Sequence, residues 1–152
     1  MFDRLDAYRS YVPLLLRLGV GLTFFFAGLG KVMGGTAGVA GFFGSLGIPA
    51  PAMMGPFIAY LELLGGLALI LGLFTRAFSL LFIANMLVAL VLVNLPAAGA
   101  AATVAEGFTS VRTELLLLLG SMCLVLLGSG LVSLDALLFK DQQFSNVEQA
   151  RV

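Results

Sequence analysis

Five polar side chains interrupt stretches of the sequence that are otherwise long and apolar, and these residues are the ones most able to carry chemistry. An ionisable group inside a membrane-spanning helix costs about 2.5 to 3.5 kcal/mol on insertion scales, so it needs a partner or a polar cavity. Two carboxylates that face one lysine could hold a polar head group and exchange protons with it. The five residues are Lys31, Glu62, Asn85, Asn94 and Glu114.

Helix geometry predicts that Lys31 and Glu62 meet. We expect a span to begin at Pro56, which places Glu62 six residues, or about 9 Å, below the membrane surface. Lys31 lies near the same surface, at the end of the preceding span. Helical side chains lean toward the N-terminus of their own helix, so in antiparallel helices Lys31 leans inward and Glu62 leans outward. The two charges should therefore converge.

The same residues also have a purely structural interpretation. Glu114 and Asn94 fall in the same half of the membrane as the Lys31–Glu62 pair, and such a cluster could simply fix the register of the helices. Asn85 lies near the middle of its span, where it either forms an interhelical hydrogen bond or contacts a ligand. A ligand or proton site and a structural staple therefore both remain open.

Composition excludes several other kinds of site. The sequence contains no histidine, which removes histidine-ligated haem, imidazole metal sites and His-assisted nucleophiles. Its single cysteine, Cys123, cannot hold an iron–sulfur cluster or close an internal disulfide. We therefore predict no metal site and no tightly bound cofactor. Eight basic residues balance eight acidic ones, so nucleic acid is a poor partner.

The elements that position these residues must lie in a lipid bilayer. The chain is 61% hydrophobic and only 11% charged, with a mean hydropathy of +1.11, which is too apolar for a soluble domain. A hydrocarbon core of about 30 Å requires roughly 20 helical residues, and four stretches meet or approach that length. Short connections favour antiparallel neighbours. We predict an all-α, integral membrane four-helix antiparallel bundle over residues 1–140, with spans at about 12–33, 56–74, 77–95 and 112–131 and a polar tail at 141–152.

Between the first two spans, residues 34–55 place aromatic and aliphatic side chains among glycines. This pattern favours a short interfacial or re-entrant segment, with a flexible loop as the alternative. After the fourth span, Ser133-Leu134-Asp135 favours a capped amphipathic turn at the membrane surface.

Most cations fall on one side of the predicted bundle. With the N-terminus inside, only Lys31 and Arg112 lie near the outer face, so the positive-inside rule predicts that both termini are cytoplasmic. A cleaved signal peptide is the other interpretation of the first span, although the apolar stretch is too long for one. We expect six cations on the inner side, namely Arg4, Arg9, Arg17, Arg76, Lys140 and Arg151. Of these, Arg17 and Arg76 are the predicted topology residues.

A series of short motifs runs through nearly the whole chain in a fixed order. They are Arg17, Gly28-Leu29-Gly30-Lys31, Leu46-Gly47-Ile48-Pro49, Glu62 with Gly65-Gly66, Leu71-Gly72-Leu73-Phe74-Thr75-Arg76, Asn85-Met86, Glu114 and the closing segment 128–135. Their ordered combination resembles the DoxX family of small bacterial and archaeal membrane proteins. The resemblance implies a four-helix fold in a prokaryotic plasma (inner) membrane. It also implies an association with quinone- or thiol-linked membrane oxidoreductase systems, and it supplies no catalytic set.

These observations lead to three function hypotheses. The first is an accessory redox subunit that binds a quinone at the polar cluster and works with membrane or soluble partner proteins; whether the chain is itself an enzyme is left open. The second is a non-enzymatic scaffold whose tail, residues 140–152, docks soluble partners. The third is a proton-coupled transporter of small solutes that uses Glu62, for which a homo-oligomer would supply more room.

Overall fold

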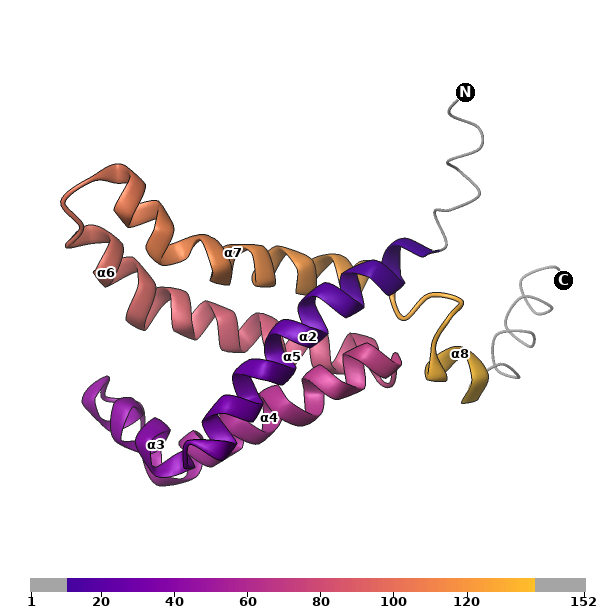
Figure 1. Ribbon diagram of the computed structural model, residues 1–152, viewed down its shortest axis with the longest axis horizontal. Helices are drawn as coiled ribbons and strands as arrows, with labels where there is room; N and C mark the ends of the chain where they lie inside the picture. Colours follow the sequence, from indigo (N-terminus) through magenta and orange to yellow (C-terminus); the bar gives the residue numbers. More distant parts are fainter. Residues whose placement is uncertain (1–10, 139–152) are drawn as a thin grey trace, which may run out of the picture.

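The computed structural model describes residues 11–138, a range that contains helices and no strand. Four helical spans in it are long and apolar enough to cross a membrane (Figure 1). The predicted all-α membrane bundle is therefore confirmed. The spans are α2 (Val12–Met33), α4 (Pro51–Leu71), a third span made of α5 (Thr75–Ala89), the π-helical turn η2 (Leu90–Asn94) and α6 (Leu95–Gly99), and α7 (Val104–Leu127), with the short helices α3 (Thr36–Ser45) and α8 (Leu134–Leu138).

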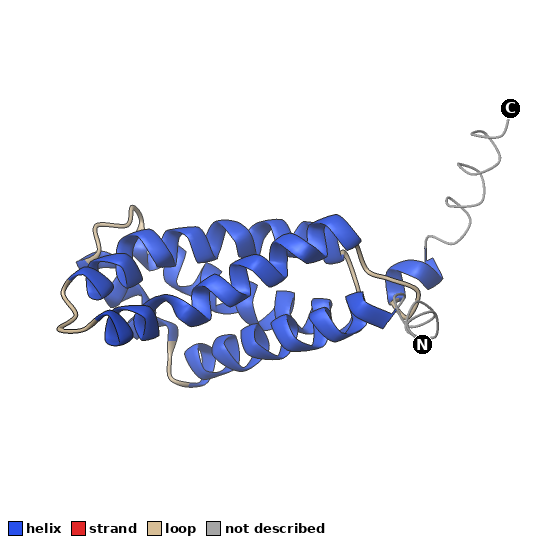
Figure 2. Cartoon of the chain, turned by 90° about the horizontal axis from the view of Figure 1, so that it is seen from above, coloured by secondary structure: helices blue, strands red, loops and turns tan. Residues whose placement is uncertain are grey.

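The elongated bundle has two ends, which we name after the short helix at each. At the α8 end, α2 begins, α4 turns into α5, and α7 finishes; at the α3 end, α2 leads into α3 and α6 turns into α7 (Figure 1). A view turned by 90° shows the connecting loops gathered at these two ends (Figure 2). Helix α2 packs mainly on α4, and α5 packs mainly on α7, so the spans form two closely packed antiparallel pairs.

Glycines allow α2 and α4 to approach closely. A Cβ atom added at Gly28 would overlap the backbone of Leu63, and one added at Gly66 would overlap the backbone of Phe25. Small residues at a helix crossing let the backbones pack directly, which is a main source of helix association in lipid. This close contact fixes the register between α2 and α4.

A small apolar core joins the two helix pairs. Phe24 of α2 and Phe82 of α5 are buried and stack face to face, with ring centroids 3.7 Å apart and an interplanar angle of 6°. The other buried residues of this core are Val20 of α2, Leu69 of α4, Met86 of α5 and Leu124 of α7. Large apolar side chains on the outer surfaces of the spans are exposed, as expected for surfaces that face lipid.

The second span begins at Pro51 rather than at Pro56, which lies inside the helix. The earlier start accompanies close packing between α3 and the first turns of α4: a Cβ at Gly55 would lie only 2.7 Å from the Ala40 nitrogen. Pro51 occupies the first turn, where a missing amide hydrogen costs least. The segment 34–55 therefore contains helix α3 and the start of α4.

The turn between the second and third spans lies earlier than predicted, because residues distant in sequence complete it. Gly72 adopts a left-handed conformation, with φ of 73°, and ends α4. The Asp135 carboxylate then accepts hydrogen bonds from the amides of Phe74 and Thr75, at 2.8 and 3.2 Å. These amides lack partners within their own helix, so Asp135 allows α5 to begin at Thr75 instead of residue 77.

The third span does not stop before Pro96 as predicted, but continues to Gly99. The amide of Leu95 donates to the carbonyl of Leu90, five residues back, so the helix widens just before the proline. A proline lacks the amide hydrogen and its ring collides with the carbonyl four residues back, and a π-turn accommodates both problems. Asn94 lies in this widened turn.

Helix α7 ends at Leu127 rather than at residue 131, because Gly128 and Gly130 have positive φ angles of 76° and 74°. The loop that follows leads into α8. There the Ser133 hydroxyl accepts a hydrogen bond from the Ala136 amide at 3.1 Å, which provides the capped turn predicted at this position.

Helix α7 begins at Val104, before the predicted residue 112, behind a capping box. The Thr103 hydroxyl accepts from the Glu106 amide and the Glu106 carboxylate accepts from the Thr103 amide, both at 3.2 Å. Thr103→Ala is expected to lower the free energy of unfolding by about 1 kcal/mol, measured on the full chain in mixed micelles. Thr109→Ala, which removes a hydroxyl bonded only to a carbonyl of its own helix, is the control; equal losses in both variants would contradict the capping role.

Candidate functional site

A cavity of about 450 Å³ lies at the α3 end of the bundle, between α3 and the spans. This volume falls in the range of small-molecule sites, about 300 to 1,000 Å³. The apolar part of the lining includes Phe42, Phe43, Leu46, Ile48, Met86 and Val93. The polar lining includes all of the predicted site residues, namely Lys31, Glu62, Asn85, Asn94 and Glu114. The structure thus brings these residues around one space, while their role in binding stays a prediction.

Lys31 and Glu62 form an ion pair between α2 and α4, as the lean of side chains in antiparallel helices predicts. The Glu62 side chain is 4% exposed and the Lys31 side chain is 34% exposed, so the carboxylate is buried and the ammonium borders the cavity. The side-chain amide of Asn85 on α5 donates to Oε1 of Glu62 at 3.1 Å. Both Glu62 oxygens are therefore held by partners from two other helices.

Asn94 and Glu114 line the same cavity but do not join this ion pair. The Asn94 side-chain amide donates to the Ser110 carbonyl, so it ties the third span to α7. Glu114 is half-buried, and no hydrogen bond or ion pair joins it to another residue of the 11–138 segment. The site therefore contains one carboxyl group that is fixed by protein contacts and a second whose oxygens are available to a ligand.

At the opposite end of the molecule, Arg17 does more than its predicted topological role requires. It is 1% exposed, and its guanidinium donates to the carbonyls of Ser129, Val132 and Ile70. Gly72 provides the necessary space, because a Cβ there would overlap the guanidinium. Arg17 therefore does not reach toward the surface; it connects α2 to the end of α4 and to the loop after α7.

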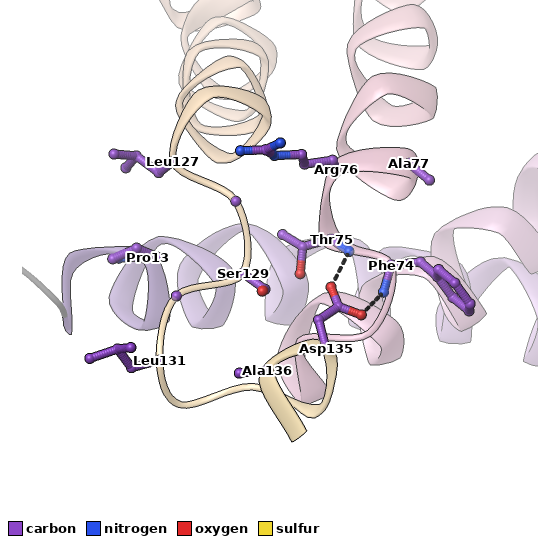
Figure 3. A pocket seen from close by; sticks show the side chains of 12 residues that line it. Pro13, Phe74, Thr75, Arg76, Ala77, Leu127, Ser129, Leu131, Asp135 and Ala136 are labelled. Atoms are coloured by element: carbon purple, nitrogen blue, oxygen red, sulfur yellow. Dashed lines mark hydrogen bonds between the residues drawn. The ribbon is translucent and has the colours of Figure 1, made fainter. Parts of the chain in front are cut away.

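Arg76, the second predicted topology residue, is exposed at the start of α5, and Asp135 caps that helix. Both line a second cavity at the α8 end, away from the predicted polar cluster (Figure 3). Cys123 is exposed on α7. The 11–138 segment contains no group of three or more acidic, cysteine or histidine side chains that could hold a metal ion. Arg4, Arg9, Lys140, Arg151 and the predicted docking tail lie outside the described residues.

Sequence reasoning missed the part that α3 plays in the cavity. Phe42 and Phe43 suggested only a segment at the membrane surface, whereas both residues line the cavity from α3. The available signal was the presence of small residues in both segments, such as Ala40 on α3 and Gly55 on α4, which permit the two helices to pack closely. Its meaning depends on which helices meet, so a single sequence does not reveal it.

The model of the DoxX family matches residues 12–95, a stretch that includes the Lys31–Glu62 pair and both asparagines of the cavity. The chain belongs to the DoxX family. It is similar to "Putative oxidoreductase CatD" of Bacillus subtilis (strain 168), with 37% identity over 134 residues that cover 88% of this chain and 92% of that protein. No solved structure matches the chain. Together with its four apolar spans, DoxX membership makes the chain a multi-pass prokaryotic membrane protein whose helices contact the bilayer.

Proposed function

We propose that this DoxX protein is an accessory subunit of a quinone- or thiol-linked membrane redox system and that the cavity at the α3 end binds a quinone head group. One observation carries the proposal: a lysine, two carboxyl groups and two amides from all four spans surround one cavity with an apolar wall. The name of the similar B. subtilis protein describes an oxidoreductase, which supports a redox context.

The cavity residues fit a quinone head group, which is a flat apolar ring with an oxygen at each end. The ammonium of Lys31 carries three donors and the amide of Asn85 carries two, so each keeps a donor after bonding to Glu62. The unpartnered Glu114 carboxyl can accept a hydrogen bond from the hydroxyl of a quinol. Phe42 and Phe43 offer apolar surface for the ring. When bound, a quinone supplies two-electron, two-proton chemistry.

The residues of this chain bind and protonate rather than transfer electrons. Glu62 holds Lys31 in place, and Glu114 is the group free to take or release a proton at the ligand oxygen. The sequence lacks histidine and has one cysteine, which leaves no ligand set for a histidine-ligated haem or an iron–sulfur cluster. Electrons would therefore pass between the quinone and a partner redox protein, which is why we propose an accessory role.

We also propose that the protein lies in the prokaryotic plasma (inner) membrane with the α8 end in the cytoplasm. The positive-inside rule supports this orientation, because the cations Arg4 and Arg9 precede α2 and the cations Lys140 and Arg151 follow α8. The polar cavity would then lie near the extracytoplasmic surface.

Quinone binding by Glu114→Gln tests the proposal. Glutamine keeps the size of the side chain but replaces the carboxyl group with an amide that carries no charge and exchanges no proton, so the affinity of the purified full-length protein for a short-chain quinol should fall at least tenfold, or about 1.4 kcal/mol. Its thermal stability should stay unchanged, because Glu114 forms no hydrogen bond or ion pair within the described segment. Arg112→Gln, two residues away on α7 and outside the cavity lining, is the matched control and should bind as the unmodified chain does.

Glu62→Gln separates a ligand site from a structural staple. It should weaken both binding and stability, because Lys31 loses its carboxylate. If neither variant changes quinol affinity, the quinone site is wrong. If Glu62→Gln lowers the stability but leaves the quinol affinity unchanged, the cluster serves only to fix the register of the helices. Solute uptake into proteoliposomes that requires a pH gradient and is lost in Glu62→Gln would instead indicate a transporter.

A further inference from the structure

A second cavity, of about 600 Å³, lies at the α8 end of the bundle, and the proposed redox function does not use it. It lies between the start of α5, the end of α7 and the loop that leads to α8 (Figure 3). Most of its wall is apolar, with Leu127, Leu131 and Ala77 among the lining residues, while Arg76, Thr75 and Asp135 supply side-chain polar groups. It therefore combines an apolar wall with a small polar patch.

Arg76 gives this cavity a positive charge that no direct contact among residues 11–138 neutralises. Its side chain is exposed, and no hydrogen bond or ion pair joins it to the rest of the 11–138 segment. The guanidinium extends over the end of α7, where Gly128 leaves room for it: a Cβ there would lie 3.3 Å from Nε of Arg76. A planar guanidinium with free donors is well suited to a phosphate group.

A second polar group beside Arg76 also lacks a partner. Thr75 is completely buried, and its hydroxyl oxygen forms no hydrogen bond with any other residue that the structure describes. In Figure 3 this hydroxyl is directed toward the space between Ser129 and Asp135, which both line the cavity. Buried hydroxyl groups usually have a hydrogen-bond partner. The Thr75 hydroxyl, which lies beside Arg76, is therefore available to a polar ligand.

The Asp135 carboxylate does not cancel the positive charge at this site. Both of its oxygens are occupied by the amides of Phe74 and Thr75, and it also interacts electrostatically with the buried guanidinium of Arg17. Arg17 and Asp135 therefore offset each other. Among the described residues that meet here, Arg76 remains as the excess cation.

We propose that this cavity binds the phosphodiester of a phospholipid whose head group has a net negative charge; the added cation of a zwitterionic head group would be repelled by Arg76. Arg76 is the second residue of the third span, which places it at the depth of lipid head groups, where basic residues attract anionic lipids. Its guanidinium and the Thr75 hydroxyl would hold the phosphate. The exposed side chains of Leu127 and Leu131 would contact the acyl chains. A free phosphate ion shares the polar chemistry but would make no use of the apolar wall.

Thermal unfolding of the full-length protein in mixed micelles tests this site. Added dioleoyl phosphatidylglycerol should raise the Tm in a saturable manner, whereas phosphatidylcholine with the same chains and inorganic phosphate should do so weakly. Arg76→Gln should weaken the apparent affinity for phosphatidylglycerol about fivefold, and Thr75→Val should weaken it about threefold. Arg112→Gln removes an exposed cation elsewhere on the chain and should leave the affinity unchanged.

Two results would overturn the proposal. One is an unchanged phosphatidylglycerol affinity in both Arg76→Gln and Thr75→Val, each compared with the unmodified chain. The other is protection by inorganic phosphate equal to that by phosphatidylglycerol, which would assign the site to a free ion. Arg76→Gln should fold normally, because the Arg76 side chain makes no hydrogen bond or ion pair within the 11–138 segment.

Discussion

Replacing Gly28 with alanine is expected to lower the free energy of unfolding by about 3 kcal/mol, the upper end of the range for overpacking a well-packed contact. The added methyl group would overlap the backbone of Leu63, and backbone atoms cannot move aside as a flexible side chain can. Helices α2 and α4 would have to separate, which weakens the packing that holds them together in lipid. Unfolding of the full chain in mixed micelles, followed by far-UV circular dichroism, measures the loss.

Gly30→Ala is the matched control for this prediction. Gly30 lies on the same helix, is exposed, and has no atom within 4 Å of an added Cβ. Alanine there should be neutral or slightly stabilising, because it restricts the unfolded chain more than glycine does. If Gly28→Ala and Gly30→Ala have the same stability, the close contact between α2 and α4 does not exist.

The Gly28 contact also connects stability to the candidate site. The added Cβ would lie 2.8 Å from the Glu62 carbonyl carbon, so the backbone that carries the buried carboxylate would be displaced. Lys31 lies three residues further along α2, which is less than one helical turn. Gly28→Ala should therefore also disturb the Lys31–Glu62 pair, and its quinol affinity should fall even under conditions in which it remains folded.

The predicted site came from local geometry, which is why much of it could be obtained from the sequence. The 3.6-residue period and the lean of helical side chains are properties of any helix, so the meeting of Lys31 and Glu62 needed only a correct pair of antiparallel spans. Glu114 was assigned to the same half of the membrane for the same reason. Whether Glu114 has a hydrogen-bond or ion-pair partner depends on the side chains of the other helices, so the lack of one among the described residues is visible only in the structure.

Helix ends were predicted less well, because distant residues determine several of them. Asp135 caps α5 from 61 residues away along the chain, so no local pattern places that start at Thr75. In the widened turn before Pro96, Asn94 donates to the Ser110 carbonyl of α7, a contact that no local sequence pattern indicates. The start of α7 is different, because the Thr103–Glu106 capping box is a local pattern that the sequence contains. The alanine-rich segment around it drew attention away from this pattern.

Arg17→Met is the second substitution for which we expect a loss of about 3 kcal/mol. Methionine replaces the apolar stem of the arginine but has no guanidinium, so three backbone carbonyls lose their donor. Each unsatisfied buried carbonyl costs about 1 to 3 kcal/mol, and water at the end of the bundle should recover part of this. Arg112→Met, which removes an exposed guanidinium elsewhere, should change the unfolding free energy by less than about 0.5 kcal/mol.

Arg17→Lys distinguishes this capping role from a purely topological one. Lysine keeps the positive charge that membrane insertion requires, but one ammonium cannot reach the carbonyls of both the α4 end and the loop after α7 as the guanidinium fork does. We expect Arg17→Lys to insert in the same orientation and to lose about 2 kcal/mol. Stability equal to that of the unmodified chain would show that only the charge at this position matters.

The two ends of the bundle should respond independently to these substitutions. Arg17 and Lys31 are separated along α2 by fourteen residues, or about 21 Å, and they contact different segments. Substitutions so far apart usually add, so Arg17→Lys combined with Glu114→Gln should show the stability of the first and the quinol affinity of the second. A reduced quinol affinity in folded Arg17→Lys alone would mean instead that the network at the α8 end controls the geometry of the cavity at the α3 end.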